Sequence, residues 1–273
     1  MRATTFAPVP RDGGQELTKC RALMTQRALE RSDATRIVPL IGTAGAMKVA
    51  PAAQLTYRNG PLLTAVEVTT IFWGAWWKAA PQSAQVGQLN KFFDDILVSA
   101  LIDQLKEYSV SGKSIGHGKH VGTLTVDKAP ATSVDDAAIV AFLEGLLAAG
   151  SVPKANANSL YFIYLPAGVT VTMSGQASCK AFCGYHDATA NNVFYCVEPH
   201  PDCQGCLAGL SAFEALTVTS SHELCEAITD PVPGQGWYDD ANGEIGDICA
   251  WQTKTVGSYI VQREWSNRAG ACI

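Results

Sequence analysis

The stretch Ser221-His222-Glu223-Leu224-Cys225-Glu226 decides the fold, and it lies in the segment 210–229, whose pattern predicts a helix. Residues four apart on a helix lie one turn above the other on the same face. His222 and Glu226 can therefore aim an imidazole nitrogen and a carboxylate at one point. Glu223 lies about 100° round the helix from His222, so its carboxylate approaches that point from the side.

An imidazole and a carboxylate aimed at one point can bind a divalent ion. The order His-Glu-x-x-Glu is similar to the His-Glu-x-x-His helix of zincins, in which the two outer residues bind zinc and the intervening Glu is the general base. Here Glu226 replaces the second His, and a carboxylate also suits harder ions. We expect one divalent ion, zinc first with calcium or manganese as alternatives, and Glu223 as the catalytic base.

The chain beyond this helix supplies further acidic side chains. The segment 236–249 reads Gly-Trp-Tyr-Asp-Asp-Ala-Asn-Gly-Glu-Ile-Gly-Asp-Ile-Cys. We expect Glu244 to be the third ligand, with Asp247 as an alternative ligand or as the hydrogen-bond acceptor of His222. The part 239–243 lacks the full EF-hand register, so a calcium loop is a weaker interpretation. The competing interpretation is a solvated acidic surface that holds no ion.

Eight of the nine cysteines lie in the C-terminal third, and only Cys20 lies earlier; the eight are Cys179, Cys183, Cys196, Cys203, Cys206, Cys225, Cys249 and Cys272. Cys203-Gln-Gly-Cys206 is a CxxC motif, which in isolation suits a redox pair or half of a zinc site. A structural zinc site needs a second matching pair, and Cys179 and Cys183 have the wrong spacing for one. The pattern favours disulfides, which form in an oxidising compartment.

One disulfide could tie the acidic segment to the helix. Cys225 lies inside the motif helix and Cys249 ends the acidic segment, so a bond between them would hold Glu244 against His222. Spacing does not determine connectivity, so this pairing is one possibility among several. A thiol–disulfide enzyme is a weaker interpretation, because the CxxC motif lacks the βαβ context of thioredoxin-like sites.

Strands and helices alternate along the rest of the chain. Apolar, β-branched and aromatic runs predict strands, and apolar residues at helical spacing predict helices. The expected strands are 62–77, 120–126, 160–165, 169–173 and 193–197, followed by a β-like tail at 257–265. The expected helices are 82–108, 210–229 and one that ends at 147 and begins at Ser133 or Asp135. Pro166-Ala-Gly168 predicts a hairpin-like connection between two of the strands.

This order predicts an α/β fold with antiparallel parts (α+β). We expect a twisted mixed sheet packed on helices, including the metal-site helix, and a disulfide-rich C-terminal part. Residues 1–54 are expected to form an N-terminal arm with one helix at 16–31, and residues 55–273 a single domain.

Composition excludes several classes of function. The net charge is −5 and no block of Lys and Arg could neutralise a phosphate backbone, so nucleic acid is excluded as a partner. The apolar runs are short, so no membrane span is expected. The N-terminus has no apolar region behind its Arg, so no secretory signal is visible.

Four stretches resemble the microbial branch of the Exordium-like (phosphate-induced protein) family; they are Tyr57-Arg-Asn-Gly-Pro-Leu-Leu63 with Ile71-Phe-Trp-Gly74, Cys183-Gly-Tyr-His186, Ser221 to Pro231, and Gly236 to Cys249. The resemblance covers about residues 55–273. It implies a fold similar to zincin metallopeptidases and a secreted or cell-wall location.

Two functions from different classes fit these observations. The first is a metal-dependent peptidase in which a metal-activated water attacks a peptide or protein substrate and Glu223 takes its proton. Tyr185 or His186 could then stabilise the oxyanion, although His186 and His200 taken alone favour structural roles. The second is a non-catalytic secreted protein that binds a cell-envelope component and has a structural metal site.

Overall fold

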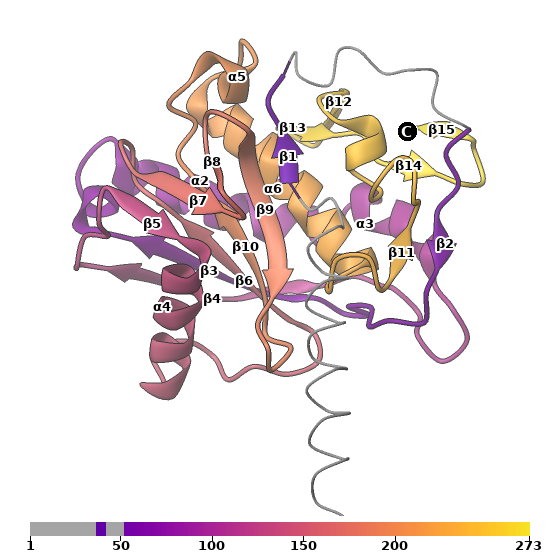
Figure 1. The fold of residues 1–273 in the computed structure, drawn as a ribbon, viewed down its shortest axis with the longest axis horizontal. Helices are drawn as coiled ribbons and strands as arrows, with labels where there is room; N and C mark the ends of the chain where they lie inside the picture. The colour runs from indigo at the N-terminus through magenta and orange to yellow at the C-terminus, as the bar shows by residue number, and fades with distance from the viewer. Residues whose placement is uncertain (1–36, 42–51) are drawn as a thin grey trace, which may run out of the picture. The chain divides into compact units, whose positions relative to one another are not determined.

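The computed structural model describes residues 37–41 and 52–273, and its centre is a six-stranded sheet with the order β1-β9-β10-β6-β3-β4 (Figure 1). The strands are β1 (Ile37–Pro39), β3 (Glu67–Trp73), β4 (Lys119–Val126), β6 (Ser159–Tyr164), β9 (Phe182–Ala188) and β10 (Phe194–Glu198). Strands β4, β3, β6 and β10 run parallel, whereas β9 is antiparallel to β10 and β1 is antiparallel to β9. The sheet is therefore mixed, as predicted.

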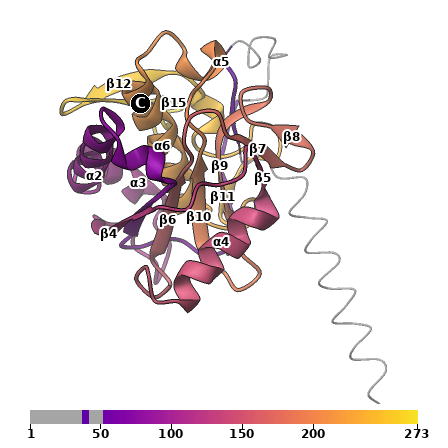
Figure 2. The same cartoon turned by 90° about the vertical axis from the view of Figure 1, so that its left-hand side faces the viewer.

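Helices cover both faces of this sheet (Figure 2). One face carries α2 (Gln82–Ile96), α3 (Ala100–Leu105) and α6 (Ala212–Thr229); the other carries α4 (Asp136–Ala148) and a small sheet of β5 (Ser133–Asp135), β7 (Thr170–Met173) and β8 (Gln176–Ala177). Successive strand residues point to opposite faces. In β6, Phe162 joins the core with α2 and α6, and Ile163 joins the core with α4.

The helix predicted at 82–108 is interrupted. Helix α2 ends at Ile96, and Ser99 caps α3 by accepting the N–H of Leu101 at 3.2 Å. A Ser hydroxyl at such a position competes with the helical backbone bonds, which explains the break. Of the two predicted caps of α4, the structure selects Asp135, whose carboxylate accepts the N–H of Ala138.

Three predictions about strands are wrong. Strands β6 and β7 do not form a hairpin, because β7 pairs with β5 and β8 in the small sheet. The expected strands leave out residues 182–188, which form strand β9. Residues 37–39, assigned to the N-terminal arm, are strand β1 at the edge of the central sheet. The predicted helix 16–31 and Cys20 lie outside the described residues.

The C-terminal part is built from short elements beyond α6. They are β11 (Trp237–Tyr238), which pairs with β2 (Thr56–Tyr57), the pair β12 (Thr253–Val256) and β13 (Tyr259–Gln262), and the pair β14 (Trp265–Ser266) and β15 (Ala271–Cys272). Short helical turns are η1 (Ala75–Lys78), η2 (Lys106–Tyr108), α5 (Gln204–Leu207) and η3 (Asp247–Cys249). Helix α6 lies between the central sheet and the yellow C-terminal strands (Figure 1) and contacts β9, β10 and β13.

Three disulfides join six of the eight described cysteines: Cys179–Cys203, Cys183–Cys206 and Cys249–Cys272. The preference for disulfides over a zinc site is confirmed. The two cysteines of the CxxC motif bond to different partners, so they are not a redox pair with each other. The pairing of Cys225 with Cys249 is wrong, because Cys225 is a buried free thiol.

In the stretches 37–41 and 52–273, no helix combines the length and the apolar character that crossing a bilayer requires.

Candidate metal centre

Helix α6 is held in register at both ends. At its start Ser211 accepts the N–H of Glu214, while the Glu214 carboxylate accepts the N–H of Ser211, a capping box. At its end Asp230 precedes a proline, which disfavours a further helical turn. Every residue from 215 to 229 is buried, so the polar side chains of this helix face the protein interior.

His222, Glu226 and Asp247 meet at one point. His222 Nε2 lies 3.0 Å from Glu226 Oε1, yet it is not aligned for a hydrogen bond with that oxygen. Asp247 arrives from η3, and its backbone N–H donates to Glu226 Oε1 at 3.0 Å. The ligand atoms of the three side chains lie within 4.8 Å of one another. Two atoms that are close but do not point at each other can both face one ion between them.

The acidic segment approaches α6 through a glycine. A Cβ on Gly246 would lie 2.7 Å from His222 Nδ1 and 2.9 Å from Glu226 Oε1, so a side chain there would displace both ligands. Gln262 of β13 supports the ring from behind, with its Nε2 2.7 Å from His222 Nδ1 and 2.9 Å from the Gly246 carbonyl oxygen. The disulfide Cys249–Cys272 fixes the segment two residues after Asp247.

A second group lies on the other side of Glu226. His186 of β9 places Nδ1 3.0 Å from Glu223 Oε2 and 3.5 Å from Glu226 Oε2. Its Nε2 lies 3.1 Å from the carbonyl oxygen of Asp230. The ligand atoms of His186, Glu223 and Glu226 also lie within 4.8 Å of one another. Glu226 therefore belongs to both groups.

The structure separates the two candidate third ligands. Asp247 lies with His222 and Glu226, as the alternative prediction states. Glu244 belongs to neither group: its Oε1 lies 3.6 Å from His186 Nε2, on the side of the ring away from Glu223. Glu244 is thus beside the centre, and the geometry favours Asp247 as the ligand next to His222.

Several buried carboxylate oxygens of this centre receive no hydrogen bond from the described residues. They are Glu223 Oε1, Glu226 Oε2 and both side-chain oxygens of Glu244. Residues His186, His222, Glu223, Glu226 and Glu244 are 0% exposed, whereas Asp247 is partly exposed. A buried ionised carboxylate without a partner costs several kcal/mol, so the donor set fits a cation that would complete it.

The acids of the centre differ in their tendency to ionise. Burial raises the pKa of Glu223, and burial together with the charge of Glu226 raises the pKa of Glu244 well above its ordinary value. Burial also acts against ionisation of Glu226, but the charge of His222 and the nearby His186 ring outweigh it and lower the pKa of Glu226 to about 2. Glu226 is therefore the carboxylate that stays ionised and can attract a cation.

Burial alone would lower the pKa of His186, yet its hydrogen bond with Glu223 and the nearby carboxylate of Glu226 outweigh burial and raise that pKa to about 10. The same balance, dominated by the charge of Glu226, raises the pKa of His222 well above its ordinary value. Without an ion, protons on the two rings thus compensate part of the acidic charge. An ion would take their place.

Sequence reasoning gave His186 a structural role and missed its place between Glu223 and Glu226. All seven residues of β9 are buried, so the strand shows no alternation of polar and apolar residues that would mark it.

Tyr185, suggested for the oxyanion, points to the other face of the sheet, where its hydroxyl donates to Asp136 at 2.8 Å. His200 pairs with Asp202 at 2.6 Å, a structural contact as predicted.

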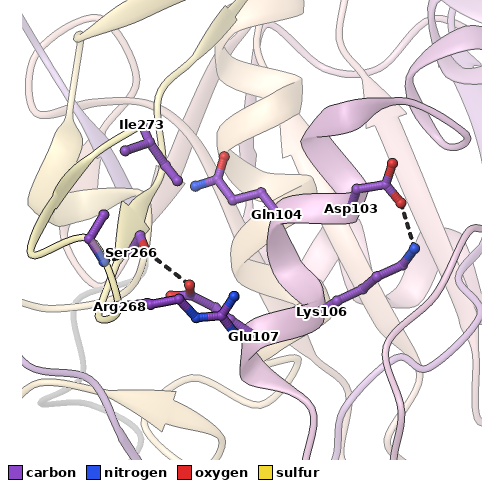
Figure 3. Close-up of a pocket in the computed structure, with 8 residues that line it drawn as sticks. Asp103, Gln104, Lys106, Glu107, Ser266, Arg268 and Ile273 are labelled. Atoms are coloured by element: carbon purple, nitrogen blue, oxygen red, sulfur yellow. Dashed lines mark hydrogen bonds and ion pairs between the residues drawn. The ribbon is translucent and has the colours of Figure 1, made fainter.

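A separate cavity of about 410 Å³ lies between the α3–η2 segment and the C-terminal residues (Figure 3). Ser266 Oγ donates to Glu107 at 2.9 Å across the cavity, and Lys106 pairs with Asp103 at 2.6 Å on its α3–η2 side. None of the candidate ligands lines it. Its acidic and basic side chains neutralise one another, so we assign it no role.

No protein-family model matches the sequence, and no curated protein matches it. Among solved structures the chain is similar to one described as "Structure of a chaperone-substrate complex", with 15% sequence identity and a TM-score of 0.28. The similarity covers 62% of this chain but 25% of that chain, so this protein spans about a quarter of its length. A similarity of this size supports no argument about fold or function.

Proposed function

We propose that this protein is a metal-dependent hydrolase of the peptidase class, with a divalent ion, zinc first, bound by His222, Glu226 and Asp247. The observation that carries the proposal is the meeting of three ligand atoms within 4.8 Å of one another, next to a carboxylate, Glu223, with an unpartnered oxygen. When bound, the ion would polarise the scissile carbonyl and make a water molecule more acidic.

The residues around the ligands supply the general base and the side from which substrate approaches. Glu223 is held through Oε2 by His186, and its Oε1 is the atom that takes the proton of the attacking water. Asp247 is the partly exposed member of the set, so a peptide or protein substrate approaches from the side of η3. The position of the base, one residue after the first ligand, is that of zincins and supports a zincin-like site in an Exordium-like chain.

Ion binding has one local requirement. Gln262 donates to Nδ1 of His222 and to Gly246, while its Oε1 accepts the N–H of Trp251 at 3.1 Å. A ring that binds an ion through Nε2 carries its proton on Nδ1. The Gln262 oxygen would then have to face the ring, and the amide would give up its bonds with Gly246 and Trp251.

Glu223→Gln tests the proposal. The amide keeps the size of the side chain but cannot accept the proton, so cleavage of a peptide library by the zinc-loaded protein should fall about 10²–10⁴-fold. The matched control is Glu144→Gln on the exposed surface of α4, which should leave cleavage unchanged. Cleavage is followed by mass spectrometry, with and without chelator. If the wild type cleaves peptides and E223Q cleaves them equally well, the mechanism is wrong.

A second function is favoured by the complete burial of His222, Glu223 and Glu226. A site closed to this degree suits a structural ion in a non-catalytic protein that binds a cell-envelope component. In that case a chelator lowers the melting temperature, while no peptide in the library is cut. The three disulfides are consistent with an extracellular location for either function.

A further inference from the structure

Glu226 faces two different groups with its two carboxylate oxygens. Oε1 lies 3.0 Å from His222 Nε2 and accepts the N–H of Asp247. Oε2 lies 3.5 Å from Nδ1 of His186 and accepts no hydrogen bond. A carboxylate that turns one oxygen to each of two ligand sets has the arrangement of a bridge between two ions.

The hydrogen bonds of His186 define what its Nδ1 can do. Nε2 lies 3.1 Å from the carbonyl oxygen of Asp230, which can only accept, so Nε2 carries a proton and donates it. In the neutral ring, Nδ1 then has a lone pair that points at Glu223 Oε2 and Glu226 Oε2. Three lone-pair atoms facing one another repel unless a proton on Nδ1 or a cation lies between them. A histidine that binds a metal usually fixes its other N–H on an acceptor in this way.

The region buries more carboxyl groups than the ligands of one divalent ion can include. Glu223, Glu226 and Glu244 are fully buried, and Asp230 and Glu198 are buried beside them. A Cβ on Gly184 of β9 would lie 3.3 Å from an oxygen of both Glu198 and Glu223, so these two acids lie near the same point of that strand. An ion at His222 and Asp247 lies on one side of Glu226 and leaves the His186 side uncompensated.

We propose that the centre binds two divalent ions that share Glu226. The first is the ion of the proposed function, bound by His222, Asp247 and Glu226 Oε1. The second is bound by His186 Nδ1, Glu223 Oε2 and Glu226 Oε2; ligands of this kind suit Zn²⁺ or Mn²⁺. Glu223 Oε1 stays free to take a proton, so the second ion adds to the proposed function and rests on its first site.

The test is the number of ions that the full chain binds. Protein stripped with a chelator is titrated with Zn²⁺, and the bound metal is measured by elemental analysis and calorimetry. The expected result is two ions per chain. His186→Gln leaves an amide N–H for the Asp230 carbonyl but removes the Nδ1 ligand, so it should bind one ion. His222→Gln should also bind one. The matched control is His120→Gln, which changes a partly buried histidine outside the centre and should leave two ions.

Any other ion count contradicts the two-ion centre. The variants then show whether the ion site of the proposed function fails with it. One ion in the wild type that is lost in H222Q and kept in H186Q leaves the first site standing, with His186 as a doubly protonated ring. One ion that is lost in H186Q and kept in H222Q removes the first site as well. No bound ion removes both.

A measurement on the wild type covers the case in which a variant does not fold. Two Mn²⁺ ions joined by one carboxylate give an exchange-coupled electron paramagnetic resonance spectrum. The protein loaded to saturation with Mn²⁺ should show this coupling. The signal of isolated Mn²⁺ alone would contradict the shared ligand.

Discussion

The two faces of the central sheet differ in whether their buried polar groups are hydrogen-bonded. On the α4 face, Tyr185 and Tyr195 are almost fully buried, and both hydroxyls donate to Oδ1 of Asp136 at 2.8 Å. On the α6 face, several buried carboxylate oxygens receive no hydrogen bond from the described residues. Both faces are otherwise packed with apolar side chains.

This difference distinguishes polar groups that support the fold from polar groups that suit a binding site. A polar group that only supports the fold is paired, because leaving it unpaired costs about 1–3 kcal/mol. The α4 face follows that rule. The α6 face departs from it at neighbouring positions, which is what a site that awaits an ion would do.

The largest expected effect is the removal of the ion, which should act on the α6 face alone. At an ion concentration about a thousand times the Kd, binding stabilises the fold by about 4 kcal/mol, or about 10 °C in Tm for a domain of this size. Chelation should therefore lower the Tm by about that amount in a thermal scan. H222Q serves as the control, since its remaining response to chelator should be smaller. An unchanged Tm in the wild type would contradict ion binding.

The pH dependence of the ion-free protein sharpens the contrast. Burial raises the pKa of Asp230 from 3.8 to about 6, so folding favours its protonated form, and this stability is lost as the pH rises from 4 through 6. At about 1.4 kcal/mol per pKa unit, Asp230 alone accounts for about 3 kcal/mol.

His186 acts in the same direction at higher pH. Its folded pKa of about 10 exceeds the ordinary 6.5, so its contribution is complete below 6.5 and is lost as the pH rises towards 10. Chemical denaturation should show the ion-free protein becoming less stable from pH 5 to 8. The ion-loaded protein should become more stable over that range, because protons compete with the ion for its ligands. Parallel curves for the two forms would argue against the centre.

A change on the α4 face should alter stability without altering ion binding. Asp136→Ala leaves the hydroxyls of Tyr185 and Tyr195 without their acceptor and should cost about 2 kcal/mol in the free energy of unfolding. Denaturant titration measures that cost, and elemental analysis should find the same number of ions as in the wild type. Loss of metal from this variant would mean that the two faces are coupled.

The smallest effect is expected at the start of α6. Ser211→Ala removes the capping box and should cost about 1 kcal/mol in the free energy of unfolding, since the helix loses one capped N–H at an exposed end. The ion count should not change, because the ligands lie more than two turns further along the helix. A cost near zero would show that tertiary packing alone fixes the register of α6.

Sequence reasoning brings together the candidate residues that lie on one helix. His222, Glu223 and Glu226 follow from helical geometry, which is local. The choice between Glu244 and Asp247 depends on the close approach of Gly246 to His222, a tertiary contact that spacing does not contain. His186 depends on the pairing of β9 with β10.

The fold divides in the same way. The alternation of strands and helices predicts the mixed sheet, because each element has its own apolar period. Strand β1 was not predicted, because three residues are too few to show an alternation of polar and apolar side chains. Its pairing with β9 is what makes it a strand. The disulfide partners could not be predicted, because the spacing of the cysteines is compatible with many connectivities.

The bond between Cys249 and Cys272 has a consequence for biosynthesis. A ribosome releases α6 with its histidine and two glutamates well before it makes Gln262 and Cys272. Asp247 lacks its anchor, and the imidazole of His222 its backing strand, until those late residues have emerged and been oxidised. Capture of the proposed ion would therefore be a final event of maturation, in whichever compartment forms that bond.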